Sequence, residues 1–157
     1  MKSIELSRGH FAIVDDEDYD VLSKITWYSQ KLKNGIFYAA RKIIVGERER
    51  MVYMHRFIMN TPDGMETDHR NGDGLDNRKD NLRNCTHQQN GMNRTKQSNN
   101  HSGFKGVCWD GYHQKWLAQI QTNGKRKRIG TFNDKKEAAR AYEAEAKRLH
   151  GEFARVN

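Results

Sequence analysis

The segment Thr67–Arg83 reads TDHRNGDGLDNRKDNLR and is the most informative stretch of this 157-residue chain. It holds one His, four Asp, three Asn and two Gly, with almost nothing apolar. So polar a run is expected to stay outside any hydrophobic core. Side chains of these types either cap their own turns or supply ligand atoms and proton acceptors. The segment is therefore predicted to be a functional loop.

Asp68 and His69 are the residues of this loop best suited to chemistry. Hydrolysis of a phosphodiester needs an activated water, stabilisation of developing charge and help for the leaving oxygen. A neutral imidazole with a pKa of about 6.5 can take a proton from water, and a carboxylate suits a hard divalent cation. Asn81 and Asn90 follow downstream, and amide oxygens also bind such cations.

The segments beside the loop are predicted to be helical. Residues 51–59 carry apolar side chains at helical spacing. Residues 80–93 begin with a good N-cap, although their Asn and Gly content gives poor helix propensity. A helix there would place Asn90 and Asn93 on one face, and metal or DNA contacts are candidates for what stabilises it.

The first 50 residues read as an N-terminal extension to which the sequence assigns no function. Acidic residues beginning at Asp15 favour a short helix, and the Asn34-Gly35 pair is a strong hairpin signal. The predicted elements are strands over 11–14, 27–29 and 37–40, and a helix over 15–22.

The last third of the chain predicts a three-stranded antiparallel sheet packed by one helix. Strand candidates cover 104–109, 115–121 and 125–132, connected at Asp110-Gly111 and Asn123-Gly124. A capping-box pattern starts the helix at Asp134 and Gly151 ends it. Residues 96–103, which are polar and without periodicity, are predicted to be a linker.

Composition favours a nucleic-acid-binding protein of two small modules. The net charge is +8, and only 35% of the residues are hydrophobic, so one large core is not expected. The last 60 residues hold 12 Lys and Arg against 6 Asp and Glu. We therefore expect the C-terminal part to supply most of the binding to DNA.

The cysteine and hydropathy patterns narrow the class of protein further. Cys85 and Cys108 do not form a CxxC pair, which excludes a Cys-rich zinc site and leaves a disulfide open. No apolar run is long enough for a signal peptide or a membrane helix. We therefore expect a soluble, intracellular protein with no membrane partner.

The run DHRNGDGLDNRKDNLR, followed by Asn90, resembles the HNH motif of phage and intron-encoded homing endonucleases. The resemblance implies a ββα-metal fold, with His69 as general base and Asn81 holding its ring. It implies Asp68 and Asn90 as ligands of one divalent cation. Because the third position is Asn90 rather than His, we expect Mg²⁺ or Mn²⁺ rather than Zn²⁺.

The segment from Gly103 to Gly151 resembles an AP2-type DNA-binding domain. It shares Gly-Val-x-Trp-Asp, Lys-Trp-x-Ala-x-Ile, Gly-Thr-Phe and Glu-Ala-Ala-x-Ala-Tyr with that family. The resemblance implies that the sheet lies in the major groove, which accepts β-ribbons. The candidate DNA contacts are Lys105, Trp109, Lys115, Trp116, Arg126, Lys127 and Arg128.

Together these readings predict an α+β protein: an extension over 1–50, a nuclease module over 51–95, a linker over 96–103 and a DNA-binding module over 104–157. The expected function is cleavage of double-stranded DNA in a bacterial cytoplasm, by a monomer that nicks or a homodimer that cuts both strands. The alternatives are a non-catalytic DNA-binding regulator and an RNA-directed nuclease. A Ca²⁺ loop is disfavoured because the bidentate Glu is missing. The other histidines are expected to be surface or packing residues, and His55, on the helix just before the motif, is the one kept as a candidate ligand.

Overall fold

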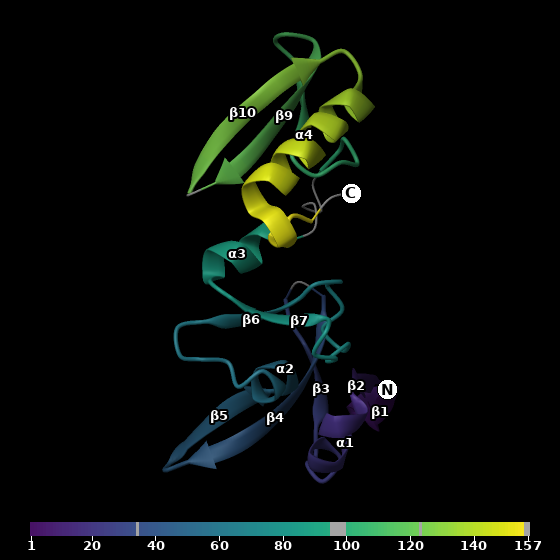
Figure 1. Cartoon of the computed structure of the whole chain (residues 1–157), viewed down its shortest axis with the longest axis vertical. Helices are drawn as coiled ribbons and strands as arrows, with labels where there is room; N and C mark the ends of the chain where they lie inside the picture. The colour runs from purple at the N-terminus through teal and green to yellow at the C-terminus, as the bar shows by residue number, and fades with distance from the viewer. Residues whose placement is uncertain (34, 95–99, 123, 156–157) are drawn as a thin grey trace. The chain divides into compact units, whose positions relative to one another are not determined.

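The computed structural model describes residues 1–33, 35–94, 100–122 and 124–155. It divides into two compact units, Met1–His87 and Gln88–Asn157 (Figure 1). Both combine small antiparallel sheets with short helices, which confirms the predicted α+β class. Within the described ranges, no helix is both long and apolar enough to span a bilayer.

The first unit contains three small sheets, of which two are strand pairs and one has three strands in the order β3-β4-β5. The N-terminal residues and the polar loop thus fold as parts of one unit. Its elements are β1 Lys2–Glu5, η1 Ser7–Gly9, β2 Phe11–Val14, α1 Asp16–Leu22, β3 Tyr28–Lys31, β4 Phe37–Val45, β5 Arg48–Tyr53, α2 Met54–Ile58, β6 Glu66–His69 and β7 Leu82–Cys85.

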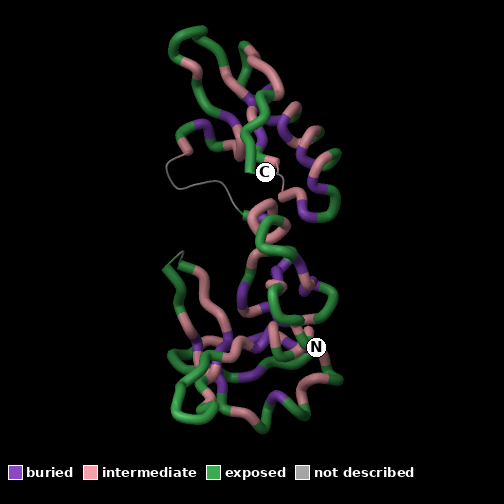
Figure 2. The backbone as a smooth tube through the Cα atoms, turned by 90° about the vertical axis from the view of Figure 1, so that its left-hand side faces the viewer, coloured by how far each residue is buried: buried purple, intermediate pink, exposed green. Residues whose placement is uncertain are grey.

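The core of the first unit draws on β1, β2, α1, β4 and α2. Trp27 is 3% exposed. Its indole Nε1 donates at 3.0 Å to the carbonyl of Leu22, the last residue of α1, and so attaches the end of this helix to the core. Figure 2 shows buried residues of this unit spread over several short elements. The apolar side chains that share this core are Ile4, Leu6, Ala12, Val14, Leu22, Trp27, Ala39 and Met54.

Two helix predictions in this region are right only in part. Residues 51–59 are split, because β5 runs to Tyr53 and only Met54–Ile58 is helical. Residues 80–93 contain strand β7, which pairs with β6, before the six-residue helix α3, His87–Met92. The burial pattern of β7 explains the second error, because Leu82 and Cys85 are buried as strand residues although their spacing also suits a helix.

The strands predicted over 11–14, 27–29 and 37–40 and the helix over 15–22 are confirmed, with shifts of a few residues at some ends. The Asn34 turn, the Asn123 turn and linker residues 96–99 fall on or include positions outside the described ranges. Both cysteines are free thiols, Cys85 buried and Cys108 exposed.

The second unit is the predicted three-stranded sheet packed by one helix. Its sheet has the order β10-β9-β8, from β8 Val107–Asp110, β9 Lys115–Thr122 and β10 Lys125–Phe132. Helix α4, Lys135–His150, begins where Asp134 accepts a hydrogen bond from the Glu137 amide at 3.3 Å, and η2, Gly151–Phe153, follows. The core residues are Val107, Ala118, Ile120, Ala138, Ala139, Tyr142 and Ala146.

Two turns of this unit have specific requirements. Gly106 has a φ of +71°, and a Cβ there would lie 2.1 Å from the Tyr142 ring, so only glycine fits. The β8–β9 connection is longer than the two-residue turn predicted at Asp110-Gly111. Asp110 closes it by accepting the amides of Tyr112 and His113, each at 3.2 Å.

Candidate active site and DNA-binding surface

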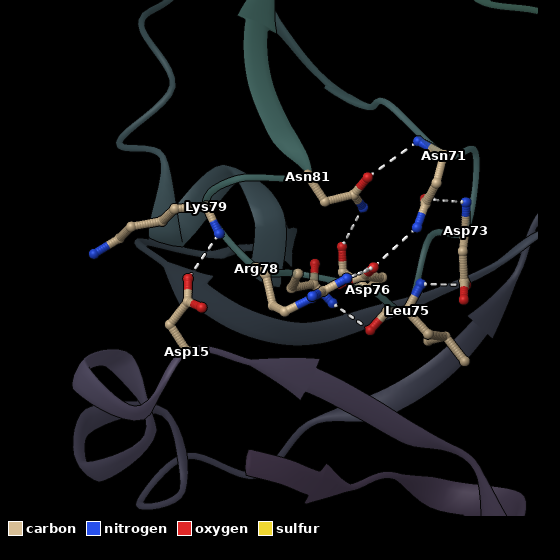
Figure 3. Close-up of polar contacts among 9 residues, drawn as sticks. Asp15, Asn71, Asp73, Leu75, Asp76, Arg78, Lys79 and Asn81 are labelled. Carbon is tan, nitrogen blue, oxygen red and sulfur yellow. Dashed lines mark hydrogen bonds and ion pairs between the residues drawn. The ribbon is translucent and has the colours of Figure 1, made fainter. Parts of the chain in front are cut away.

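The polar loop between β6 and β7 is held by its own side chains. Asn71 Oδ1 accepts the Asp73 amide at 2.8 Å, and Asp73 Oδ1 accepts the Leu75 amide at 3.0 Å (Figure 3). These are local turns of the kind that Asn and Asp favour. Turn capping, one of the two roles expected for side chains of this type, is thus confirmed for Asn71 and Asp73.

Asn81 closes the loop across its width. Its Nδ2 donates to the Asp76 carbonyl at 2.7 Å, and its Oδ1 accepts the Asn71 amide at 3.0 Å (Figure 3). One amide thus joins the two sides of the loop immediately before β7. These two bonds assign Asn81 to the loop backbone, whereas the family resemblance implies a role at the His69 ring.

The N-terminal residues brace the loop from outside. Ile13 on β2 exchanges backbone hydrogen bonds with the loop, donating to Leu75 and accepting from Asn77, both at 2.8 Å. The Lys79 amide donates to Asp15 at 2.8 Å (Figure 3). The first strands and α1 therefore position the loop, a role that the sequence did not reveal.

Much of the loop and its flanking strands is buried, so the expectation that this run stays outside the core is wrong. Asp76 is 4% exposed, forms two hydrogen bonds with Arg78 at 2.8 and 2.7 Å, and accepts from Asn71. The Arg78 guanidinium holds the pKa of Asp76 below its usual range. Gly74 makes the packing possible, because a Cβ there would lie 2.4 Å from the Phe37 carbonyl oxygen. Burial is tolerated because polar partners replace water.

His69 ends β6 and is 5% exposed. Its Nε2 lies 3.4 Å from Oδ1 of the fully buried Asn77, whose Nδ2 donates to the Leu75 carbonyl at 3.1 Å. Because the amide oxygen can only accept, this network assigns the proton of neutral His69 to Nε2. The lone pair able to take a proton is then on Nδ1. Burial lowers the pKa of His69, and the contact with Asn77 partly offsets that.

Two aromatic rings contact His69, and a third packs against both of them. The His55 ring is perpendicular to the His69 ring at a centroid distance of 4.9 Å, and Tyr38 meets it at 5.7 Å. Tyr53 stacks on His55 at 5.5 Å and meets Tyr38 edge-on at 6.1 Å. His55 therefore packs beside the motif, and its role as a candidate ligand stays a prediction. Burial lowers the pKa of His55 to about 3, so it stays neutral.

Asp68 lies opposite Arg83 in the β6–β7 register. Its Oδ2 accepts Arg83 Nε at 2.9 Å and a terminal guanidinium nitrogen at 2.6 Å, with both side chains 7% exposed. Asp68, His69 and Asn81 thus lie in the first unit. Asn90 is half-buried on α3 and belongs to the second unit.

Sequence reasoning missed three contributors to this site: Tyr38, Asn77 and Arg83. Arg83 could have been found by treating residues 82–85 as a strand paired with 66–69, because that register places Arg83 opposite Asp68. Tyr38 and Asn77 carry no spacing signal, since their contacts with His69 depend on how β4 and the loop pack.

The register of the second sheet separates the predicted DNA contacts into two faces. Ala118 and Ile120 are buried under α4, so β9 residues of the other parity point away from the helix. Arg126 pairs with Gln121 and Arg128 with Gln119 on that outer face. Lys115 also lies there by alternation. Gln119 and Gln121 were not predicted.

Lys127 and the two tryptophans have partners on the helix side. Lys127 Nζ lies 2.8 Å from Glu145 of α4, and Arg148 and Lys127 together lower the pKa of Glu145 to about 2. Trp116 packs at the edge of the core and meets Trp109 edge-on at 5.1 Å. These three contacts show side chains turned away from the outer face.

Lys105 is also engaged within its unit. Its Nζ donates to the Met92 carbonyl at the end of α3, at 2.6 Å. Burial lowers the pKa of Lys105 to about 8. Its position ties α3 to the loop that enters β8.

Comparison with known proteins supplies an independent view of both units. Residues 52–92 match the family described as "HNH endonuclease", and residues 102–152 match "AP2 domain". The "Uncharacterized HNH endonuclease L560" of Acanthamoeba polyphaga mimivirus is 29% identical over 150 residues, covering 96% of this chain and 76% of that protein. "Protein 3.8" of Escherichia phage T7 is 31% identical over 94 residues, covering 60% of this chain and 77% of that protein. No solved structure matches significantly.

Proposed function

Because the chain belongs to the HNH endonucleases and carries an AP2 domain, we propose that it hydrolyses double-stranded DNA with one divalent cation. The nuclease class follows from the family. The substrate form, the metal and the residue roles are the proposal. The single observation that carries it is the buried, neutral His69, oriented by Asn77 at the end of β6.

His69 is the proposed general base. With its proton held on Nε2, Nδ1 can accept a proton from the attacking water, and the lowered pKa keeps that nitrogen unprotonated at neutral pH. Tyr38 and His55 restrict rotation of the ring by contact. Asn81 acts indirectly, by closing the loop that presents Asn77.

Asp68 and Asn90 are the proposed ligands of the cation. Among the described residues, no three His, Cys, Asp or Glu side chains form a metal cage. One carboxylate and one amide instead suit Mg²⁺ or Mn²⁺, which keep water and bind substrate phosphate. When bound, such a cation would stabilise charge on the phosphate and the leaving oxygen. Arg83 holds the Asp68 carboxylate in a fixed position on β6.

We further propose that β6, β7 and α3 form the ββα-metal module of this family, since they follow in that order. The outer face of the β8–β10 sheet would bind the duplex through Lys115, Arg126 and Arg128. Guanidinium groups suit both phosphate and guanine edges. With Glu145 next to it, Lys127 is a weaker candidate.

The proposed function also includes the kind of break and the biological setting. One HNH site cuts one strand, so a monomer would nick DNA and a homodimer would break both strands. A nuclease joined to a DNA-binding domain, with viral and phage relatives, suits a homing endonuclease acting in an infected cell.

Conversion of supercoiled plasmid to nicked or linear DNA tests this function. Full-length protein should cleave with Mg²⁺ or Mn²⁺ and stop when EDTA is added. Specific binding without cleavage under all metal conditions would favour the non-catalytic regulator instead. Cleavage of RNA but not DNA would refute the proposed substrate.

A further inference from the structure

Strands β4 and β5 continue beyond the third strand of their sheet. β3 pairs with residues 37–40 of β4, whereas β5 pairs with residues 40–45. Residues 41–52 therefore form a two-stranded hairpin, called here the β4–β5 ribbon, and none of the described residues forms a third strand beside it. Figure 1 shows the two strands extending together from the rest of their unit.

Strand register sorts the charges of the ribbon onto two faces. Directly paired residues share a face, and the pairs Arg41–Val52, Ile43–Arg50 and Val45–Arg48 lie on one of them. This arginine face has three guanidinium groups and no carboxylate. The opposite face carries both Lys42 and Glu49, which neutralise each other in an ion pair at 2.8 Å. Charge totals along the sequence conceal this separation.

The arginine face is anchored at its base and exposed toward its tip. Arg41 is half-buried, with its guanidinium carbon 5.8 Å from the centre of the buried Trp27 ring. Arg48 and Arg50 are exposed, and neither has an ion pair within the part of the chain that is described. Val45, beside Arg48, is 47% exposed. An unpaired basic face with exposed apolar side chains is typical of an interaction surface.

We propose that the arginine face of the β4–β5 ribbon binds double-stranded DNA, as a contact separate from the β8–β10 sheet. The inference rests on the proposed function, because it assumes that DNA is the substrate. A two-stranded ribbon fits the major groove, and Arg side chains bind phosphates and guanine edges. β5 ends at Tyr53, which stacks on His55, and the His55 ring contacts His69. The ribbon would therefore hold the duplex close to the cleaved phosphate.

Binding of full-length protein to a mixed-sequence 30-base-pair DNA duplex, measured by fluorescence anisotropy over a range of salt concentrations, tests the ribbon. The variant is Arg48→Ala with Arg50→Ala. Its matched control is Lys24→Gln with Lys42→Gln, which removes the same total charge. Lys24 is exposed outside the ribbon, and Lys42 is exposed on the ribbon face opposite the arginines. Thermal unfolding verifies that each protein is folded.

We expect the slope of log Kd against log salt to fall by roughly 1.8 in the arginine variant, or about 0.9 for each lost phosphate contact. The control should keep the wild-type slope. Equal losses in both variants would mean that only net charge matters, and would overturn the inference. An unchanged slope in the arginine variant would also overturn it, whereas failure of the wild type to bind any duplex would refute the proposed function itself.

Discussion

His55 and His69 lie in perpendicular contact, with ring centroids 4.9 Å apart and both side chains almost completely buried. His55 comes from the short helix α2 and His69 from the end of β6. Burial lowers the pKa of both rings, so two neutral imidazoles share this space at neutral pH. The contact places a protonation-sensitive group directly beside the proposed base.

Protonation of His55 should destabilise the first unit in acid. Its folded pKa of about 3 lies below the ordinary 6.5, so the unfolded chain binds the proton more tightly. The stability gained by keeping His55 neutral is fully present above pH 6.5 and is lost as pH falls toward 3, by at most about 1.4 kcal/mol per pH unit. Urea unfolding at pH 7, 6 and 5 should show this slope in the wild type and a shallower slope in His55→Phe. Equal slopes would contradict the account.

The rate of DNA cleavage should remain high at mildly acidic pH. A general base works while unprotonated, and burial places the pKa of His69 below 6.5. Single-turnover rates should therefore be maximal near neutrality and decline only as pH falls through that lowered pKa. Binding measured in parallel separates this effect from loss of DNA. An acid midpoint well above 6.5 would be incompatible with a buried, neutral base.

Removal of Arg83 should strongly destabilise the protein. The Arg83→Ala change leaves the buried Asp68 carboxylate without its guanidinium partner, which typically costs about 3–5 kcal/mol. Denaturant unfolding measures the loss. The double change Asp68→Asn with Arg83→Met removes both charges and should recover much of the stability. If Arg83→Ala unfolds at the wild-type midpoint, the ion pair contributes nothing.

DNA affinity should depend on the outer face of the β8–β10 sheet more than on its helix side. Arg126→Ala with Arg128→Ala should lower the salt slope by about one unit for each lost phosphate contact. Lys127→Ala should lower it less, because Lys127 pairs with Glu145 on α4. Titration of a DNA duplex with each variant at several salt concentrations measures these slopes. Equal losses from all three positions would contradict the assignment of faces.

Local sequence patterns are sufficient to predict some of the secondary-structure elements of this chain. The N-cap at Asp134 and the strand over 115–121 depend on local signals, and both appear as predicted. The strand at 82–85 was missed because Leu82 and Cys85 fit helical spacing as well as a buried strand. Pairing with β6 decides between them, and that pairing is not a local property.

The candidate site was predicted in part for the same reason. Asp68 and His69 stand out through residue chemistry alone. The contact between His69 and Asn77 depends on β2, because Ile13 fixes the backbone of the loop from more than 60 residues away. The rings that contact His69 come from β4 and α2, and Tyr53 at the end of β5 packs against both of them. Such long-range packing leaves no periodic signal in a single sequence.

The most direct test of the central claim is the single-turnover nicking rate of His69→Ala on plasmid DNA with Mg²⁺ or Mn²⁺. Because a general base typically contributes about 10²–10⁴-fold, the variant should nick at least about 100-fold more slowly. Its duplex affinity should match the wild type. A His69→Ala protein that nicks at the wild-type rate would contradict the assignment of His69 as the base.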